Sequence, residues 1–230
     1  MLKSTCSSAG EARVQNPPDE YPGEQNPLVA ISTSRTFNAE ALNMIRPSDR
    51  FRMLVEHFEI FGLDPVFTHT DITPWFPEMT DTAIRVMVNR QCAKGDVVRA
   101  VCHGAYQASR LDWSSKRILA ATALKLRGGM DTYVTMHSAI EKEDGAESPL
   151  LLVCVTAGRD GVIKSERHGI LALKHTNTPI DDIRGTLVWD EKLRCLRASK
   201  LRARLDFQKH QLGLRSMLRK ARTNAELPEL

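Results

Sequence analysis

The stretch PLLLVCVTAGRDGVIKS, Pro149–Ser165, contains the most apolar run of the chain. Its first half is rich in leucine and valine and predicts a buried β-strand. The AGRDG segment, Ala157–Gly161, predicts a hairpin turn with a glycine in the left-handed conformation, and Val162–Ser165 is expected to return as the second strand. We expect a sheet to be built around this pair.

Further strand patterns lie on both sides of this stretch. The predicted strands are Ala83–Asn89, Asp131–Ile140, Gly169–Lys174 and Gly185–Trp189. Asp96–Gln107 is predicted to be a helix, and Ile118–Leu126 fits either a strand or a buried helix. In total we expect five to seven strands and two or three helices. Because the helices interrupt the sheet and do not alternate with every strand, the predicted class is α+β, a small mixed or antiparallel sheet with two or three packed helices.

Composition divides the chain into four segments. Residues 1–37 are predicted to be a disordered, proline-rich head. Residues 38–80 are expected to hold a helical segment, with a helix over 48–62 that Ser48 caps and Gly62 ends, followed by a loop. The α+β body then covers 81–190, and 191–230 is predicted to be a basic amphipathic tail that is helical at least in part.

The overall composition is that of a globular protein. Of the 230 residues 42% are hydrophobic and 26% are charged, and the net charge is +4. No apolar run is long enough for a membrane span, and no signal peptide is expected. The five cysteines are scattered without a CxxC pair, which argues against disulfides and structural zinc and indicates a reducing compartment.

Motifs for catalysis or cofactor binding are absent from the sequence. There is no GxGxxG, GxxxxGKS/T, GxSxG or HExxH pattern. His69 and Asp71 lie close together but lack a third partner nearby, so Asp71 is expected to cap a loop. Cys102 and His103 are neighbours on a predicted helix, where their side chains would diverge. We therefore predict no catalytic residues, no metal and no cofactor, and a protein that is not an enzyme.

Positive charge is concentrated in two regions. Residues 183–222 carry twelve Lys and Arg against three Asp and Glu, and residues 90–128 carry eight against two. Such excesses are typical of surfaces that bind phosphate backbones or anionic lipid headgroups, although a solvated face is the alternative. The predicted anion-binding residues are Lys116, Arg117, Lys125, Arg127, Arg194, Arg197, Lys200, Arg202, Arg204, Arg219, Lys220 and Arg222.

The head holds one candidate partner motif. In NPPDEYPG, Pro17 and Pro18 precede Tyr21 in an arrangement close to the PPxY ligand of WW domains. The tyrosine lies one residue too far along the chain, so a plain proline-rich linker is the alternative. A host WW-domain protein is thus a further candidate partner.

The order of elements, with GILALKH at Gly169–His175 followed by IRGTLVW at Ile183–Trp189, resembles the matrix proteins of rhabdoviruses over roughly residues 83–190. The resemblance implies a non-enzymatic structural protein that condenses viral ribonucleoprotein, self-associates and binds an anionic membrane surface during assembly. It implies a location at the inner surface of the virion and at the membrane periphery in the host cytoplasm, with the nucleus as a further location.

Two other functions fit the same features. An RNA-binding viral regulator, such as an interferon or silencing suppressor, would also use a basic helix beside a small sheet. A plant-virus movement protein is likewise a basic nucleic-acid binder rich in β-structure. Aromatic residues make up only 6% of the chain, which counts against an extensive stacking surface for single-stranded RNA.

Overall fold

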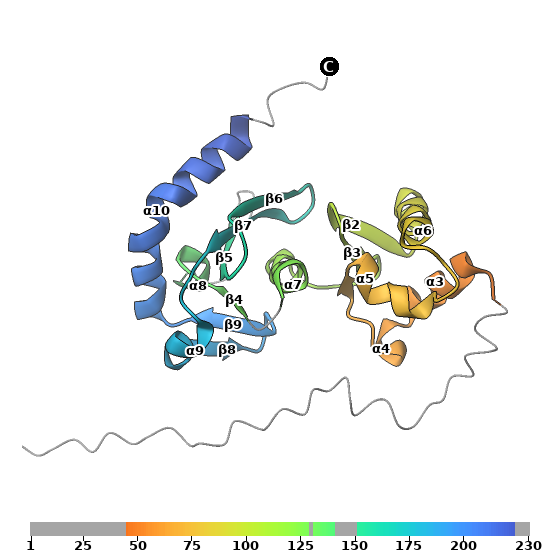
Figure 1. Cartoon of the computed structure of the whole chain (residues 1–230), viewed down its shortest axis with the longest axis horizontal. Coiled ribbons are helices and arrows are strands. Elements are labelled where there is room, and N and C mark those ends of the chain that lie inside the picture. Colours follow the sequence, from red (N-terminus) through yellow and green to blue (C-terminus); the bar gives the residue numbers. More distant parts are fainter. Residues whose placement is uncertain (1–44, 129–130, 141–150, 224–230) are drawn as a thin grey trace, which may run out of the picture. The chain divides into compact units, whose positions relative to one another are not determined.

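The computed structural model describes residues 45–128, 131–140 and 151–223 (Figure 1). All of them belong to one compact unit, Glu40–Leu230. The predicted head and the motif at Pro17, Pro18 and Tyr21 lie outside the described residues.

A mixed six-stranded sheet forms the larger part of the fold. In spatial order its strands are β6 (Gly161–Ser165), β7 (Gly169–His175), β5 (Leu151–Thr156), β4 (Thr132–Val134), β9 (Cys195–Ala198) and β8 (Leu187–Asp190). β5 runs parallel to β7 and β4 runs parallel to β9, whereas the other neighbours are antiparallel. The predicted α+β class with a mixed sheet is confirmed.

Helices cover both faces of this sheet. Leu152 and Cys154 of β5 pack with Leu119 and Ala123 of α7 (Ser115–Arg127). The alternate residues of β5 face the other side, where α8 (His137–Ile140) and the long helix α10 (Lys200–Thr223) pack. Figure 1 shows α7 and α10 on opposite sides of the sheet. This period-two alternation explains why β5 is apolar at nearly every position.

A second, antiparallel sheet has the order β1-β3-β2 and packs with the N-terminal helices. Its strands are β1 (Val66–Phe67), β2 (Val98–Cys102) and β3 (Ala105–Ala108). The helices are α3 (Pro47–Glu56), α4 (Phe58–Phe61), α5 (His69–Ile72) and α6 (Asp81–Lys94), with the 3₁₀ turn η2 (Thr73–Trp75). The remaining short elements are α9 (Ile180–Ile183) and η4 (Arg184–Thr186).

The predicted strand at Ala83–Asn89 is wrong, because this segment lies within α6. The Thr80 side chain caps the helix by accepting from the Ala83 backbone N–H, and Gly95 ends it in the left-handed conformation. The alternating β-branched residues imitate a strand, yet only Ile84 and Val88, one helical turn apart, are buried among them.

The predicted helix at Asp96–Gln107 is also wrong. The segment forms the β2–β3 hairpin, in which Ala100 pairs with Tyr106 and Gly104 adopts a positive φ of 83° at the turn. Its valines and alanines suit both a helix face and a buried strand, and the turn at Gly104 decides between the two.

The predicted hairpin turn at Ala157–Gly161 is wrong in its pairing. Val162–Ser165 does form a strand, β6, but β6 pairs with β7, which lies between β6 and β5. The true hairpin turn lies between Ser165 and Gly169, where Gly169 has a φ of 96°. The turn residues at 157–161 predicted that β5 pairs with the next strand in the sequence, β6. In the structure β5 instead pairs in parallel with β7.

Smaller corrections concern element ends. The first described helix begins at Pro47 with Arg46 as its N-cap, so Ser48 does not cap it, although Gly62 does end the second helix in the left-handed conformation. The expected loop after Gly62 contains β1, α5 and η2. The open alternative at 118–126 is resolved as helix α7, and the strand expected over 131–140 stops at Val134.

Candidate basic surfaces

The structure brings five of the predicted anion-binding residues to one region. Lys116 and Arg117 lie in the first turn of α7, which contains no acidic residue. Arg194 lies in the loop between β8 and β9, while Arg197 and Lys200 follow on β9 and at the start of α10. These residues are divided between two hollows of the surface: Lys116, Arg197 and Lys200 line one, and Arg117 and Arg194 line the other. Leu193 lines both hollows. We call these five residues the hairpin–helix cluster.

The loop between β8 and β9 is held by Asp190. Its carboxylate accepts hydrogen bonds from the backbone N–H groups of Lys192 and Leu193, both at 3.0 Å. The Arg194 N–H donates to the Asp190 carbonyl at 2.7 Å, and Arg194 adopts a φ of 54°. Only two described residues other than glycine have a positive φ, and such strain is often found where a side chain serves binding.

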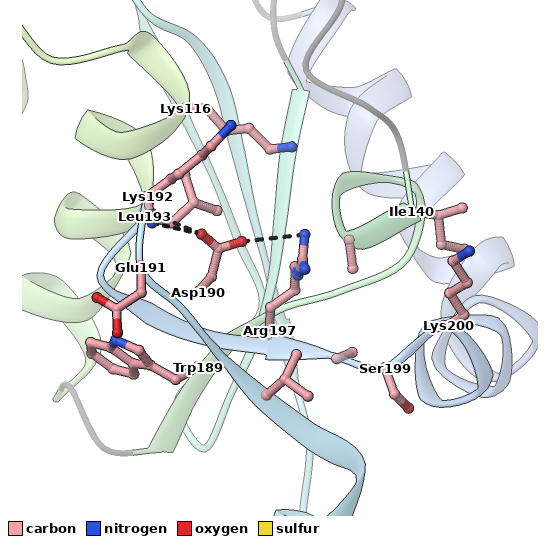
Figure 2. Close-up of a pocket in the computed structure, with 13 residues that line it drawn as sticks. Lys116, Ile140, Trp189, Asp190, Glu191, Lys192, Leu193, Arg197, Ser199 and Lys200 are labelled. Carbon is pink, nitrogen blue, oxygen red and sulfur yellow. Dashed lines mark hydrogen bonds and ion pairs between the residues drawn. The ribbon is translucent and has the colours of Figure 1, made fainter.

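The larger hollow, of about 600 Å³, is lined by Lys116, Arg197 and Lys200 together with the exposed side chains of Val188 and Trp189 (Figure 2). Asp190 lies within it and forms an ion pair of 3.3 Å with Arg197, as Figure 2 shows. Part of the local positive charge is therefore neutralised inside the protein.

Other predicted anion-binding residues have structural partners. Lys125 forms ion pairs with Asp64 at 2.6 Å and Asp71 at 3.1 Å, and these hold α7 against the segment around β1. Arg202 pairs at 2.9 Å with Asp206, which is almost fully buried. Because these ion pairs neutralise Lys125 and Arg202, the two residues attract an external anion less strongly.

The remaining residues of the prediction differ in what surrounds them. Arg127 lies against the segment that follows β5, where its side chain approaches Gly158 and Gly161. Arg204, Arg219 and Lys220 are exposed on α10. Arg222 lies in the last turn of that helix.

An outer face of α10 carries exposed leucines. Leu201, Leu205 and Leu212 are 69%, 51% and 76% exposed, and their spacing of four and seven residues places them in one line along the helix. We define these three leucines and the flanking exposed cations Arg204, Lys209 and Arg215 as the α10 outer face. The sequence predicted a basic amphipathic tail over 191–230 but not which of its leucines face outward, and Leu193 of the same segment is buried in the core.

No arrangement suited to catalysis emerges from the described residues. Asp71 was expected to cap a loop; it instead accepts from the Thr68 N–H in a capping box at the start of helix α5. Burial raises the pKa of the Cys92 thiol to about 11, and burial likewise raises the pKa of Cys102, so neither favours a thiolate. Ser115 and His168 lie 3.1 Å apart, Oγ to Nδ1, without a third group that orients the imidazole.

Among the described residues, no group of three or more His, Cys, Asp or Glu could hold a metal ion. Within the same ranges, no helix has the length and apolar character needed to cross a bilayer. Comparisons with models of protein families, with curated proteins and with solved structures found no match.

Proposed function

We propose that this protein is a non-enzymatic, matrix-like assembly protein that attaches to anionic membrane surfaces through the α10 outer face. The observation that carries the proposal is the line of exposed leucines between cations on α10. Large apolar side chains gathered on one exposed face mark interaction sites. A basic helix with a second apolar stripe is typical of a helix that lies in the membrane interface.

The combination favours lipid over RNA. A phosphate backbone attracts Arg204, Lys209 and Arg215 but provides no apolar environment for the leucines. A bilayer interface provides both anionic headgroups for the cations and an apolar layer for the leucines. Each cation near an anionic bilayer contributes about 1 kcal/mol. Full burial of a leucine contributes about 1.5–3 kcal/mol, of which shallow insertion realises a part. Together these contributions support reversible, salt-sensitive attachment.

In this role the protein would self-associate and bind viral ribonucleoprotein at the inner surface of the virion. Before assembly it would lie at the membrane periphery in the host cytoplasm. RNA binding as the main activity is a second candidate, and Trp189 supports it. This exposed indole lines the larger hollow, as Arg197 and Lys116 do from other positions, and offers one stacking position for a base.

Vesicle flotation tests the proposal. Nuclease-treated protein is floated with phosphatidylserine vesicles at low and physiological salt, with and without added RNA. The variant Leu201→Gln/Leu205→Gln/Leu212→Gln is expected to weaken vesicle binding by at least about tenfold, because it removes apolar insertion and keeps every charge.

A matched control carries Ile60→Gln and Val86→Gln, which remove two exposed apolar side chains elsewhere. A charge variant reverses Arg204, Lys209 and Arg215 to Glu and leaves Arg202 in place, because Arg202 supports the fold. The proposal would be contradicted if the leucine variant and its control lost vesicle binding to the same extent, or if flotation required RNA. RNA binding with a steep salt dependence and no flotation would favour the RNA-binding alternative.

A further inference from the structure

The second hollow, of about 480 Å³, lies between α7, the segment at β1 and the β8–β9 loop. Trp113, Leu124 and Leu193 contribute apolar walls, and Arg117 and Arg194 contribute two guanidinium groups. None of the residues of the α10 outer face lines it. Its size falls within the usual range of small-molecule sites.

Among the residues that the structure describes, the two guanidinium groups of this hollow have no acidic partner. Arg117 lies over the Trp113 ring, with 3.5 Å between the guanidinium carbon and the ring centroid, and its Nε is buried without a hydrogen-bond acceptor. Within the described ranges neither Arg117 nor Arg194 forms an ion pair. Arg117 and Arg194 line the same hollow, and burial, followed by the positive charge of Arg194, lowers the pKa of Arg117.

The acidic group of the lining is already engaged. Asp64 pairs with Lys125, which also pairs with Asp71. In addition, the first turn of α7 places Lys116 and Arg117 at the positive end of a 13-residue helix, an unfavourable position for cations. The hollow therefore has an excess of positive charge that an external anion would relieve.

We propose that this hollow binds a phosphate monoester, with the phosphate between Arg117 and Arg194 and the apolar part of the ligand against Leu124 and Leu193. A phosphate monoester carries about −1.5 to −2 charges at neutral pH, which matches two guanidinium groups better than a carboxylate does. Guanidinium groups also bind phosphate oxygens in a bidentate manner. The proposal stands apart from membrane attachment through α10.

Isothermal titration with phenyl phosphate tests the site, with phenyl sulfate as the monoanionic control. Wild-type protein is expected to bind phenyl phosphate more tightly than phenyl sulfate. Arg194→Gly and Arg117→Gln are each expected to weaken the binding of phenyl phosphate by about tenfold or more, because each removes one charge-assisted contact. Arg90→Gln, which removes an exposed guanidinium on α6, should leave the binding of phenyl phosphate unchanged.

Arg194→Gly separates binding from folding. Glycine adopts the positive φ of this position without strain, so the variant should keep or raise the melting temperature while it loses the ligand. Equal affinity for the two probes, or unchanged phenyl phosphate binding in Arg194→Gly, would overturn the proposal. The leucine variant of α10 should bind phenyl phosphate like the wild type even if the membrane proposal fails.

Vesicles distinguish the source of the phosphate. Phosphatidic acid presents a monoester, whereas phosphatidylserine presents a diester. A lipid ligand is indicated if Arg194→Gly weakens flotation with phosphatidic acid and not with phosphatidylserine. A free organic phosphate is indicated if the variant loses phenyl phosphate and floats equally with both vesicles.

Discussion

The two faces of α10 differ although they share one helix and one composition. On the inner face Ala203, Asp206 and Leu214 are buried against the sheet and α8. On the outer face the three leucines stand exposed between cations. Arg202 and Arg204, two residues apart, show the same contrast, since the first pairs with Asp206 and the second is exposed. The position of a residue around the helix therefore decides whether it serves stability or binding.

A polar network fixes the inner face to the sheet. Asp206 is 1% exposed and accepts hydrogen bonds from Thr135 Oγ1 at 2.7 Å and Tyr133 Oη at 3.1 Å, and it pairs with Arg202. Burial, and then the negative charge of Asp206, raise the pKa of Tyr133, which keeps its hydroxyl protonated as a donor. A buried carboxylate with three partners specifies how α10 docks.

The largest effect is expected at this network. Asp206→Ala leaves Arg202 without its ion-pair partner and two buried hydroxyls without an acceptor, so the free energy of unfolding should fall by about 3–5 kcal/mol. Urea denaturation measures this change in the free energy of unfolding. Arg204→Ala on the other face is the control, with a change within about 0.5 kcal/mol. A loss below about 1 kcal/mol for Asp206→Ala would show that the network does not hold the helix.

Two leucines on opposite faces of α10 should differ in their contribution to stability. Leu214→Ala removes a side chain that packs with Met136, Val153 and Ala172, and should cost about 2–4 kcal/mol. Leu212→Ala, two residues earlier and largely exposed, should cost less than about 0.5 kcal/mol. Thermal or urea unfolding of the two variants gives the difference. Similar losses in both would mean that a protein surface covers Leu212 in solution, as in a self-associated form.

The smallest effect concerns Gly213. Alanine in place of a mid-helix glycine normally stabilises by about 1 kcal/mol. Here an added Cβ would lie 3.2 Å from Nζ of Lys174, which is buried and paired with Asp160. We expect the free energy of unfolding to change by less than about 0.5 kcal/mol, because the gain is offset by the displaced ammonium group. Ser216→Ala, in the same helix, serves as the control for propensity alone, and a full gain for Gly213→Ala would show that Lys174 moves freely.

Some elements of the fold were predictable from the sequence. The runs at 151–156 and 169–175 are strands because β-branched and apolar residues at successive positions suit a strand that is buried on both faces. The basic C-terminal helix was likewise predictable from its cations and leucines. The true structures of Ala83–Asn89, a helix, and of Asp96–Gln107, a hairpin, were not predictable in this way. Valine and alanine in short segments fit both the helical and the strand period, so the capping and turn residues decide between the two structures.

For the candidate sites the division is similar. The residue types alone indicate a long basic helix with leucines and a local excess of cations around residues 116–127 and 192–204, since charge and apolar content are properties of composition. Which of these cations are neutralised by distant acids depends on contacts that form only in the folded protein. Lys125 pairs with Asp64 and Asp71, which lie 61 and 54 residues away in the chain. Arg117 and Arg194, from elements far apart in the chain, line one hollow without an acidic partner among the described residues. The physical reason is that pairing depends on distances of a few ångströms across the fold, and sheet order sets those distances.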